Sequence, residues 1–219
     1  AQVVSTKKNY TWSGLQTWKK ETGYKKNNKN LFHVVAVDYG IKKNILRYFS
    51  DFNCKVTVVS CKTNANKILN LKPDGIFLSN GPGDPKATFE KIKSNLFLIK
   101  NTEIPIFGIC LGHQILSLLF GGKTEKMHHG HRGANHPIKN HANGKVEITV
   151  QNHGFVVSKK KLVTNMKVTH SSLFDGTIAG IKIINKPFFS VQYHPESSPG
   201  PQDSRYLFQK FEKLIENYA

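Results

Sequence analysis

The first half of the chain alternates short apolar runs with amphipathic stretches, and this alternation limits the possible fold more than any other feature. The apolar runs HVVAVD, KVTVVS, GIFLS and IPIFGIC occupy residues 33–38, 55–60, 75–79 and 104–110. Apolar residues recur at helical spacing in residues 39–52, around 68–71, near 88–100 and in 111–122. Strands that alternate with helices pair in parallel through right-handed crossovers. The sequence therefore predicts an α/β fold with a mainly parallel, open sheet flanked by helices.

The second half has a different pattern, with little helix between its apolar runs. The short strand candidates there are KVEITV, GFVV, KVTH, TIAGIKII and FFSVQY. A final amphipathic helix is predicted over residues 204–218. Closely spaced short strands favour antiparallel pairing. We therefore expect a small antiparallel portion beside the parallel sheet.

The domain organisation follows from where the apolar pattern begins. Residues 1–30 are polar, rich in Lys and Asn, and show little apolar periodicity, so they are interpreted as a linker or lead-in segment. Residues 31–219 are predicted to form one globular domain, which a chain of this length can support. The first residues lack the pattern of a signal peptide. The chain starts with Ala1 rather than Met, which suggests a fragment or a processed chain.

Charge and cysteine content indicate the cellular compartment and the class of binding partner. No apolar run reaches the roughly 18 residues that span a bilayer, so no membrane partner and a cytoplasmic location are expected. The three cysteines are too few and too unevenly spaced for a disulfide framework, which favours a reducing compartment. The formal charge is +18, but it comes mainly from scattered Lys, whereas base recognition favours Arg. A basic surface, with an acidic protein partner as one option, is preferred over nucleic-acid binding.

The strongest local motif is GICLG at residues 108–112, where an apolar strand meets an apolar helix. Its pattern is that of a nucleophile elbow with Cys in place of Ser. Glycines two residues either side of Cys110 permit a tight turn that exposes the sulfur, and the helix N-terminus favours a thiolate. Cys110 is therefore the candidate nucleophile; the alternative is a buried, inert core thiol, since free Cys is often fully buried.

QYHPE at residues 192–196 supplies the groups that a thiolate needs. His194 and Glu196 are two residues apart at the end of an apolar strand, so both side chains point to one face. Glu196 can then hold the imidazole in its working tautomer and stabilise its protonated form. Alone, HPE is typical of a turn with a solvated Glu; together with the elbow it indicates a catalytic set of Cys110, His194 and Glu196.

Attack on a carboxamide creates an oxyanion, which requires donors that are already in position. In an elbow, the backbone N–H of the residue after the nucleophile, here Leu111, provides one donor. The loop SNGPGDP follows directly after the strand GIFLS and is the expected source of a second donor. Its Gly81 and Gly83 allow close approach of a ligand to the backbone.

GICLGHQ, SNGPGDP, QNHGF and HPESSPGP, in this order, resemble a class I glutamine amidotransferase, which implies a flavodoxin-like α/β fold. VAVDYGIKKNIL, GHRGANHP and SLFDGT extend the resemblance to the glutaminase domain of the carbamoyl-phosphate synthetase small subunit, from about residue 10 to the C-terminus. The resemblance implies that Cys110 forms a glutamyl thioester, that His194 transfers protons and that Glu196 orients it. It also implies that the glutamine substrate contacts Gly81, Gly83, Leu111, Gln114, Asn152, Gly154 and Phe155.

The same resemblance implies partners. The family's small subunit carries an additional N-terminal domain that is missing here, and one glutamine contact comes from that domain. Ammonia would pass to a carbamoyl-phosphate synthetase large subunit, which uses ATP, Mg and bicarbonate; no cofactor is expected in this chain. The alternatives are the glutaminase of another amidotransferase, such as anthranilate or GMP synthesis, and a catalytically idle regulatory scaffold.

Other motifs receive simpler interpretations. MHHGH at residues 127–131, together with His136, is predicted to lie in a Gly-containing loop without the spacing of a metal site, so no metal is expected. Asp175, which precedes Gly176, is predicted to be a turn residue. His153 could order the glutamine pocket or simply pack there. Cys54 and Cys61 are predicted to be core or surface thiols.

Overall fold

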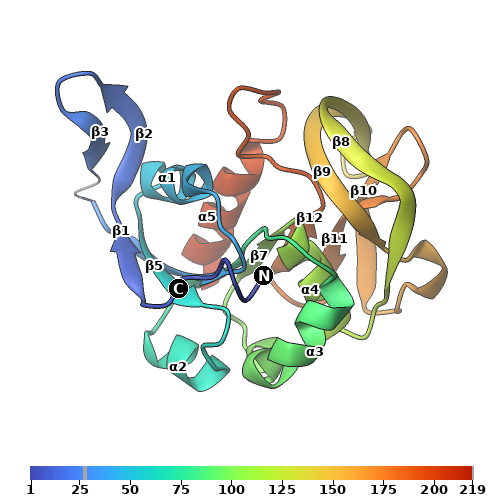
Figure 1. Ribbon diagram of the computed structural model, residues 1–219, viewed down its shortest axis with the longest axis horizontal. Helices are drawn as coiled ribbons and strands as arrows, with labels where there is room; N and C mark the ends of the chain where they lie inside the picture. Colours follow the sequence, from blue (N-terminus) through green and yellow to red (C-terminus); the bar gives the residue numbers. More distant parts are fainter. Residues whose placement is uncertain (27–28, 219) are drawn as a thin grey trace.

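The computed structural model describes residues 1–26 and 29–218, and it confirms the predicted α/β fold with a mainly parallel central sheet (Figure 1). Ten strands form one sheet in the order β1-β5-β4-β6-β7-β12-β11-β10-β8-β9. Its parallel centre consists of β5 (Cys54–Ser60), β4 (Phe32–Asp38), β6 (Gly75–Leu78), β7 (Ile106–Ile109) and β12 (Phe188–Val191). All five of these strands were predicted from their apolar runs.

The central strands are apolar on both faces because helices cover both sides of the sheet. In β4, Val35 and Val37 face one core cluster, whereas Val34 and Ala36 face the other. On the first side lie α2 (Ala65–Asn70), α3 (Pro85–Leu96), a short 3-10 helix (Phe97–Asn101) and α4 (Leu111–Leu119). On the second side lie α1 (Lys43–Asp51) and α5 (Tyr206–Tyr218). No helix among residues 1–26 and 29–218 is long and apolar enough to cross a membrane.

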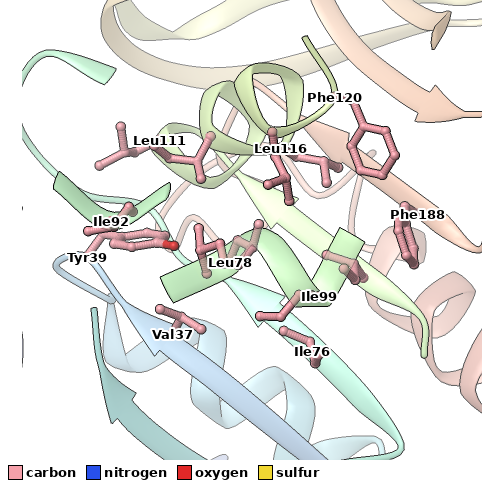
Figure 2. Close-up of a cluster of buried hydrophobic side chains, with 14 of the residues drawn as sticks. Val37, Tyr39, Ile76, Leu78, Ile92, Ile99, Leu111, Leu116, Phe120 and Phe188 are labelled. Atoms are coloured by element: carbon pink, nitrogen blue, oxygen red, sulfur yellow. The ribbon is translucent and has the colours of Figure 1, made fainter. Parts of the chain in front are cut away.

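The first core cluster joins α3 and α4 to the sheet, and Figure 2 shows how its side chains interlock. Leu111 and Leu116 of α4 lie above the sheet with Phe120, while Ile76 and Leu78 project from β6 towards the 3-10 helix and α3. This packing fixes α4 against the sheet. The start of α4, which follows Cys110, is therefore held at the carboxyl end of β7.

The antiparallel portion continues the sheet beyond β12. It consists of β11 (Ile178–Ile183), β10 (Met166–Ser172), β8 (Thr124–Asn140) and β9 (Val146–Val157), and a one-turn 3-10 helix (Lys159–Lys161) follows β9. KVEITV and GFVV, predicted as separate strands, are two parts of β9. The long β8–β9 ribbon occupies one end of the molecule (Figure 1).

One prediction in this portion is wrong, because residues 127–131 and His136 lie in strand β8 and not in a loop. β8 pairs with β9 through backbone contacts such as His131 opposite His153. Its buried side chains include His131, which contacts Asp175, and His136, whose ring packs against that of His131. The strand therefore lacks the apolar alternation by which strands are recognised in a sequence.

The N-terminal segment also contains strands that the sequence did not indicate. β1 (Tyr10–Trp12) pairs antiparallel with β5 at the edge of the large sheet, and β2 (Gly14–Lys19) and β3 (Gly23–Lys26) form a separate hairpin beside α1. Arg47 of α1 lies over the Tyr24 ring, 3.8 Å from its centre. Residues 27 and 28 of the predicted linker and residue 219 of the predicted domain lie outside the described residues. The assignment of residues 1–30 as a linker from another domain stays a prediction.

Candidate active site

Cys110 lies in the turn between β7 and α4 with a backbone φ of 54° and ψ of −102°. A non-glycine residue with positive φ is unfavourable and is retained where the surrounding structure holds it. Here the Cys110 N–H donates to the carbonyl of Val191 on the neighbouring strand β12, at 2.9 Å. The sulfur therefore occupies a fixed position at the carboxyl edge of the parallel sheet, as the elbow motif predicted.

The two glycines of the motif are required by close packing. A Cβ on Gly108 would lie 2.8 Å from the carbonyl oxygen of Gly112, and a Cβ on Gly112 would lie 2.0 Å from the carbonyl oxygen of Leu78. Real Cβ atoms do not approach backbone this closely. Any side chain at Gly112 would therefore push α4 away from β6.

His194 and Glu196 follow β12, the strand next to β7, and both are buried, with 4% and 1% of their surface exposed. Their Nδ1 and Oε1 atoms are 2.8 Å apart. Burial lowers the pKa of His194, but the charge of Glu196 and a side-chain contact with Cys110 outweigh it and raise this pKa to about 10. Burial raises the pKa of Glu196, but His194 and Lys42 outweigh it and lower this pKa. At neutral pH the pair is an imidazolium and a carboxylate.

The structure therefore brings the three predicted catalytic residues together. The Cys110 side chain is within hydrogen-bonding reach of His194, and the charge interaction between them also contributes to the raised pKa of His194. Cys110 itself is 5% exposed and lines a cleft. The arrangement can deliver a nucleophilic sulfur and a proton donor to the same bound group.

Lys42 is a third charged partner that sequence reasoning missed. Its Nζ lies 3.1 Å from Glu196 Oε1 and 3.2 Å from His194 Nδ1, and it also lines the cleft. Asn44, two residues later, donates from its side chain to the backbone carbonyl of Glu196. The loop and first turn after β4 thus hold the Glu196 segment in place, although YGIKKNIL was interpreted as a helix and as part of the family resemblance, without a site role for Lys42.

A network of side-chain amides supports the other side of the sulfur. Gln192 Nε2 is 3.8 Å from Cys110 Sγ, and its Oε1 accepts a hydrogen bond of 3.0 Å from Gln114 Nε2. The same Gln114 nitrogen donates to the Phe155 carbonyl at 2.8 Å. Gln114 was a predicted glutamine contact, whereas Gln192 lay inside the quoted motif QYHPE but was not assigned a role.

The predicted oxyanion residues lie at the same edge of the sheet. Gly81 allows the loop after β6 to pass the carbonyl of Tyr39, which a Cβ would approach to 2.1 Å, and Gly83 has a φ of +104°. Asn80 ties this loop to the neighbouring one, because its Nδ2 donates to the Gly40 carbonyl at 3.0 Å. Leu111 begins α4, where backbone N–H groups have no partner within the helix.

These segments enclose a cleft of about 640 Å³. Among the predicted residues, those that line it are Cys110, His194, Gly81, Gly83, Gln114, Asn152, Gly154 and Phe155. Leu111 and Glu196 are buried and do not line the cleft. The rim on β8 adds basic groups that were not predicted as site residues: Lys126, His128, His129 and Arg132. Most of the titratable side chains that line the cleft are therefore basic, with Asp84 as an acidic exception, which suits a substrate that carries a carboxylate.

The remaining motifs lie near the cleft or in the core. Within the described residues, no three His, Cys, Asp or Glu side chains are grouped as a metal site. Asp175 accepts hydrogen bonds from the Thr177 backbone and hydroxyl, which confirms the predicted turn, and its other oxygen contacts His131. Cys54 and Cys61 are both buried free thiols in the core.

A cysteine elbow that meets a His–Glu pair at the carboxyl edge of a parallel sheet defines a candidate cysteine-dependent hydrolase. The family model for glutamine amidotransferase class-I matches residues 35–214. The chain therefore belongs to the class I glutamine amidotransferase family. The resemblance predicted from GICLGHQ, SNGPGDP and HPESSPGP is thereby confirmed.

Two relatives indicate which member of this family the chain resembles. The chain is 54% identical over 217 residues to the carbamoyl phosphate synthase small chain of Rhizobium meliloti, covering 98% of this chain and 54% of that protein. It is 56% identical over 206 residues to the same protein of Agrobacterium fabrum, covering 94% and 51%. The chain thus spans about half the length of these relatives.

A solved structure supports the fold. The crystal structure of a putative GMP synthase component from Thermoplasma acidophilum matches with a TM-score of 0.75, covering 85% of this chain and 95% of that one. Its sequence identity is 21%, so the likeness concerns the fold alone.

Proposed function

We propose that the chain hydrolyses glutamine to glutamate and ammonia with Cys110, His194 and Glu196 as the catalytic residues. The observation that carries the proposal is the buried pair of His194 and Glu196, whose Nδ1 and Oε1 atoms lie 2.8 Å apart, at the cleft that Cys110 also lines. A positively charged partner stabilises a thiolate, which is the nucleophilic form of cysteine.

The reaction then has two halves. The Cys110 thiolate attacks the side-chain carbonyl carbon of glutamine, and the carbonyl oxygen becomes an oxyanion. His194 gives its proton to the departing nitrogen, so that the C–N bond breaks, ammonia leaves and a glutamyl thioester remains. Neutral His194 next takes a proton from water, the hydroxide attacks the thioester, and glutamate leaves while the sulfur regains its starting state.

The surrounding residues are proposed to bind the substrate and the oxyanion. The backbone N–H of Leu111 and the backbone around Gly81 and Gly83 stabilise the oxyanion, because donors fixed in advance need no reorganisation as charge develops. Gln114, Asn152, Gly154 and Phe155 contact the amino-acid part of glutamine. The proposed hydrolysis of glutamine uses no metal and no cofactor.

The ammonia is proposed to serve carbamoyl phosphate synthesis on a separate large subunit, where ATP, Mg and bicarbonate are used. Support comes from the 54% identity to a carbamoyl phosphate synthase small chain across nearly the whole chain. Because the chain spans about half of such relatives, an N-terminal small-subunit domain is proposed as a further partner. The product would feed pyrimidine and arginine synthesis.

Ammonia release tests the hydrolysis. Purified chain is incubated with glutamine, and ammonia is measured for the native protein and for Cys110→Ala. We expect a loss of at least about 10³-fold, since the variant lacks the atom that forms the thioester. Cys54→Ala, which removes a buried thiol outside the cleft, should retain activity. Full activity in Cys110→Ala would refute the triad.

A second assay separates the proposal from its alternatives. The chain is combined with a carbamoyl phosphate synthase large chain, ATP, Mg and bicarbonate, and carbamoyl phosphate is measured with glutamine as the nitrogen source. We expect formation that depends on Cys110. Glutamine hydrolysis without carbamoyl phosphate formation would instead indicate another amidotransferase. The absence of both reactions would indicate an idle regulatory scaffold.

A further inference from the structure

The side-chain amide of Gln192 joins the sulfur of Cys110 to the amide of Gln114, although the proposed reaction does not use it. Gln192 directly follows β12, and its backbone N–H donates to the Ala179 carbonyl of β11 at 2.9 Å. Its side chain is 1% exposed and does not line the cleft. Any effect of Gln192 on bound glutamine must therefore pass through the groups that its amide contacts.

The Phe155 carbonyl fixes the orientation of both amides. A carbonyl oxygen only accepts hydrogen bonds, so the nitrogen of Gln114 faces it, at 2.8 Å. The same nitrogen lies 3.0 Å from Gln192 Oε1, which accepts its second hydrogen. The nitrogen of Gln192 is thereby directed to Cys110 Sγ, at 3.8 Å. One orientation of each amide therefore satisfies all three contacts.

This arrangement uses both hydrogens of the Gln114 nitrogen and leaves its oxygen without a donor. Among residues 1–26 and 29–218, Gln114 makes hydrogen bonds only through Nε2. Its side chain is buried but lines the cleft. Acceptors in the interior of native proteins nearly always have a partner. The oxygen of Gln114 is therefore available to accept from an N–H group of a ligand in the cleft.

The chemistry of glutamine identifies that N–H group. In the proposed reaction the carboxamide nitrogen takes a proton from His194, so it must face that residue. The α-ammonium group is the other donor of glutamine, and the cleft offers few acceptors to a cation. Asp84 is the acidic exception among the basic lining residues, and its Oδ1 already accepts from the Lys86 and Ala87 backbone N–H groups. The α-ammonium group is thus the expected partner of the Gln114 oxygen.

We propose that Gln192 is a positioning residue that gives the site its preference for an α-amino acid: its oxygen holds the Gln114 nitrogen, so that the Gln114 oxygen accepts from the α-ammonium group of glutamine. The inference deepens the proposed function and rests on it. Gln192 touches no substrate atom and is not a catalytic residue.

Loss of the Gln192 oxygen would leave one N–H of the Gln114 amide without an acceptor. Because an unpaired buried donor is unfavourable, the amide is expected to rotate until its nitrogen faces the cleft. An N–H group there repels an ammonium group. Removal of the Gln192 amide should therefore weaken the binding of ligands that carry an α-ammonium group and leave other ligands unaffected.

The test compares two electrophiles that label Cys110: the diazoketone analogue of glutamine, and the same molecule with hydrogen in place of its α-amino group. The labelling rate is measured by mass spectrometry against the concentration of each compound. In the native chain, we expect half-saturation at a roughly 10-fold lower concentration of the amino compound, as is typical of one hydrogen bond to a charged group.

Gln192→Met keeps the length of the side chain but has no amide. The half-saturating concentration of the amino compound should rise in this variant until the preference is below about 3-fold, whereas that of the desamino compound should change little. The maximal labelling rates of the two compounds should change by the same factor, because the lost contact with the sulfur affects both equally.

Matched variants exclude a general effect on packing. Ser190→Ala removes another buried contact between β12 and α4, at 2.9 Å from His113 Nδ1, and should leave the preference unchanged. In a Gln114→Met background the accepting oxygen is already absent, so Gln192→Met should cause no further loss of preference. Gln192→Asn, whose amide is one methylene group shorter, should lose the preference as Gln192→Met does. Thermal unfolding shows which variants are folded.

The outcomes are separable from those of the proposed function. Equal half-saturation by the two compounds in the native chain would overturn the positioning role, and so would an undiminished preference in folded Gln192→Met or Gln192→Asn. Absence of Cys110 labelling by both compounds in the native chain would instead refute the proposed function.

Discussion

Glu196 is the residue on which the charge state of the site depends most. It is the first cause that raises the pKa of the buried His194, against the opposing effect of burial. A group with a raised pKa stabilises the folded state fully below its unfolded pKa, here 6.5, and this stabilisation is lost as pH rises towards about 10. The lowered pKa of Glu196 acts in the opposite direction, with stabilisation that is lost as pH falls below 4.5.

Replacing Glu196 by Gln should therefore lower the pKa of His194 from its raised value, because burial is then opposed only by the contact and charge of Cys110. An NMR titration of the His194 ring measures this directly, with a midpoint near 10 expected in the native chain. Glu147→Gln, which alters a buried acid elsewhere on β9, serves as the control and should leave the midpoint unchanged. A His194 that titrates near 6.5 in the native chain would contradict the assigned ion pair.

Residue types and motif order were sufficient to find most of the candidate site. Cys110, His194 and Gln114 lie in motifs that indicate a cysteine-dependent amidotransferase, and all three line the same cleft. Lys42 and Gln192 were missed because a lysine in a helical pattern and a glutamine on a strand have many roles. Only the folded geometry, with Lys42 at 3.1 Å from Glu196, distinguishes them.

At the scale of elements, the contact between α4 and β6 decides whether the elbow can form. Gly112→Ala would place a Cβ 2.0 Å from the Leu78 carbonyl, so α4 must move away from the sheet. We expect a loss of about 3 kcal/mol in the free energy of unfolding, together with loss of activity. Denaturant unfolding measures the first quantity.

Gly154→Ala is the matched control for stability, since nothing lies within 4 Å of a Cβ there. Its free energy of unfolding should stay within about 0.5 kcal/mol of the native value. Equal stability of Gly112→Ala and Gly154→Ala would show that the elbow tolerates a wider separation of α4 and β6.

The opposite face of the sheet is held by an aromatic cluster around Phe107 of β7. Its ring contacts those of Phe77, Phe189, Phe208 and Phe211 and is fully buried. Phe107→Ala should cost about 3–5 kcal/mol in the free energy of unfolding, because a cavity remains between β7 and α5. Phe97→Ala, at a phenylalanine that is 59% exposed, should cost less than about 0.5 kcal/mol. Comparable losses in the two variants would contradict this placement of the core.

Elements were predictable where their apolar pattern reports burial. The strands β4, β6 and β7 were predicted correctly because both of their faces are buried and apolar. The helix α4 was predicted correctly because its apolar residues recur at helical spacing. β8 was missed because most of its buried side chains are polar: His131, His136 and Asn140 are buried beside Ile138. β1 was missed because it is mostly exposed and is held by backbone pairing with β5.

At the scale of the whole molecule, the site exists only when distant segments meet. Lys42, Gly81, Cys110 and His194 come from four separate connections, and Phe155 comes from strand β9. Because residues this far apart cannot meet in the unfolded chain, the reactivity of Cys110 towards a glutamine-like reagent reports on the complete fold. Reactivity should disappear at the denaturant concentration at which the global fold is lost.

The identity of the modified cysteine is the most direct test of glutamine hydrolysis at this site. The native chain is treated with an electrophilic glutamine analogue and analysed by peptide mass spectrometry. We expect one adduct, on Cys110, that excess glutamine suppresses; Cys54 should stay free because burial raises the pKa of its thiol to about 12. An unmodified Cys110, or equal modification of Cys54 and Cys61, would contradict the assignment of Cys110 as the nucleophile of a glutamine site.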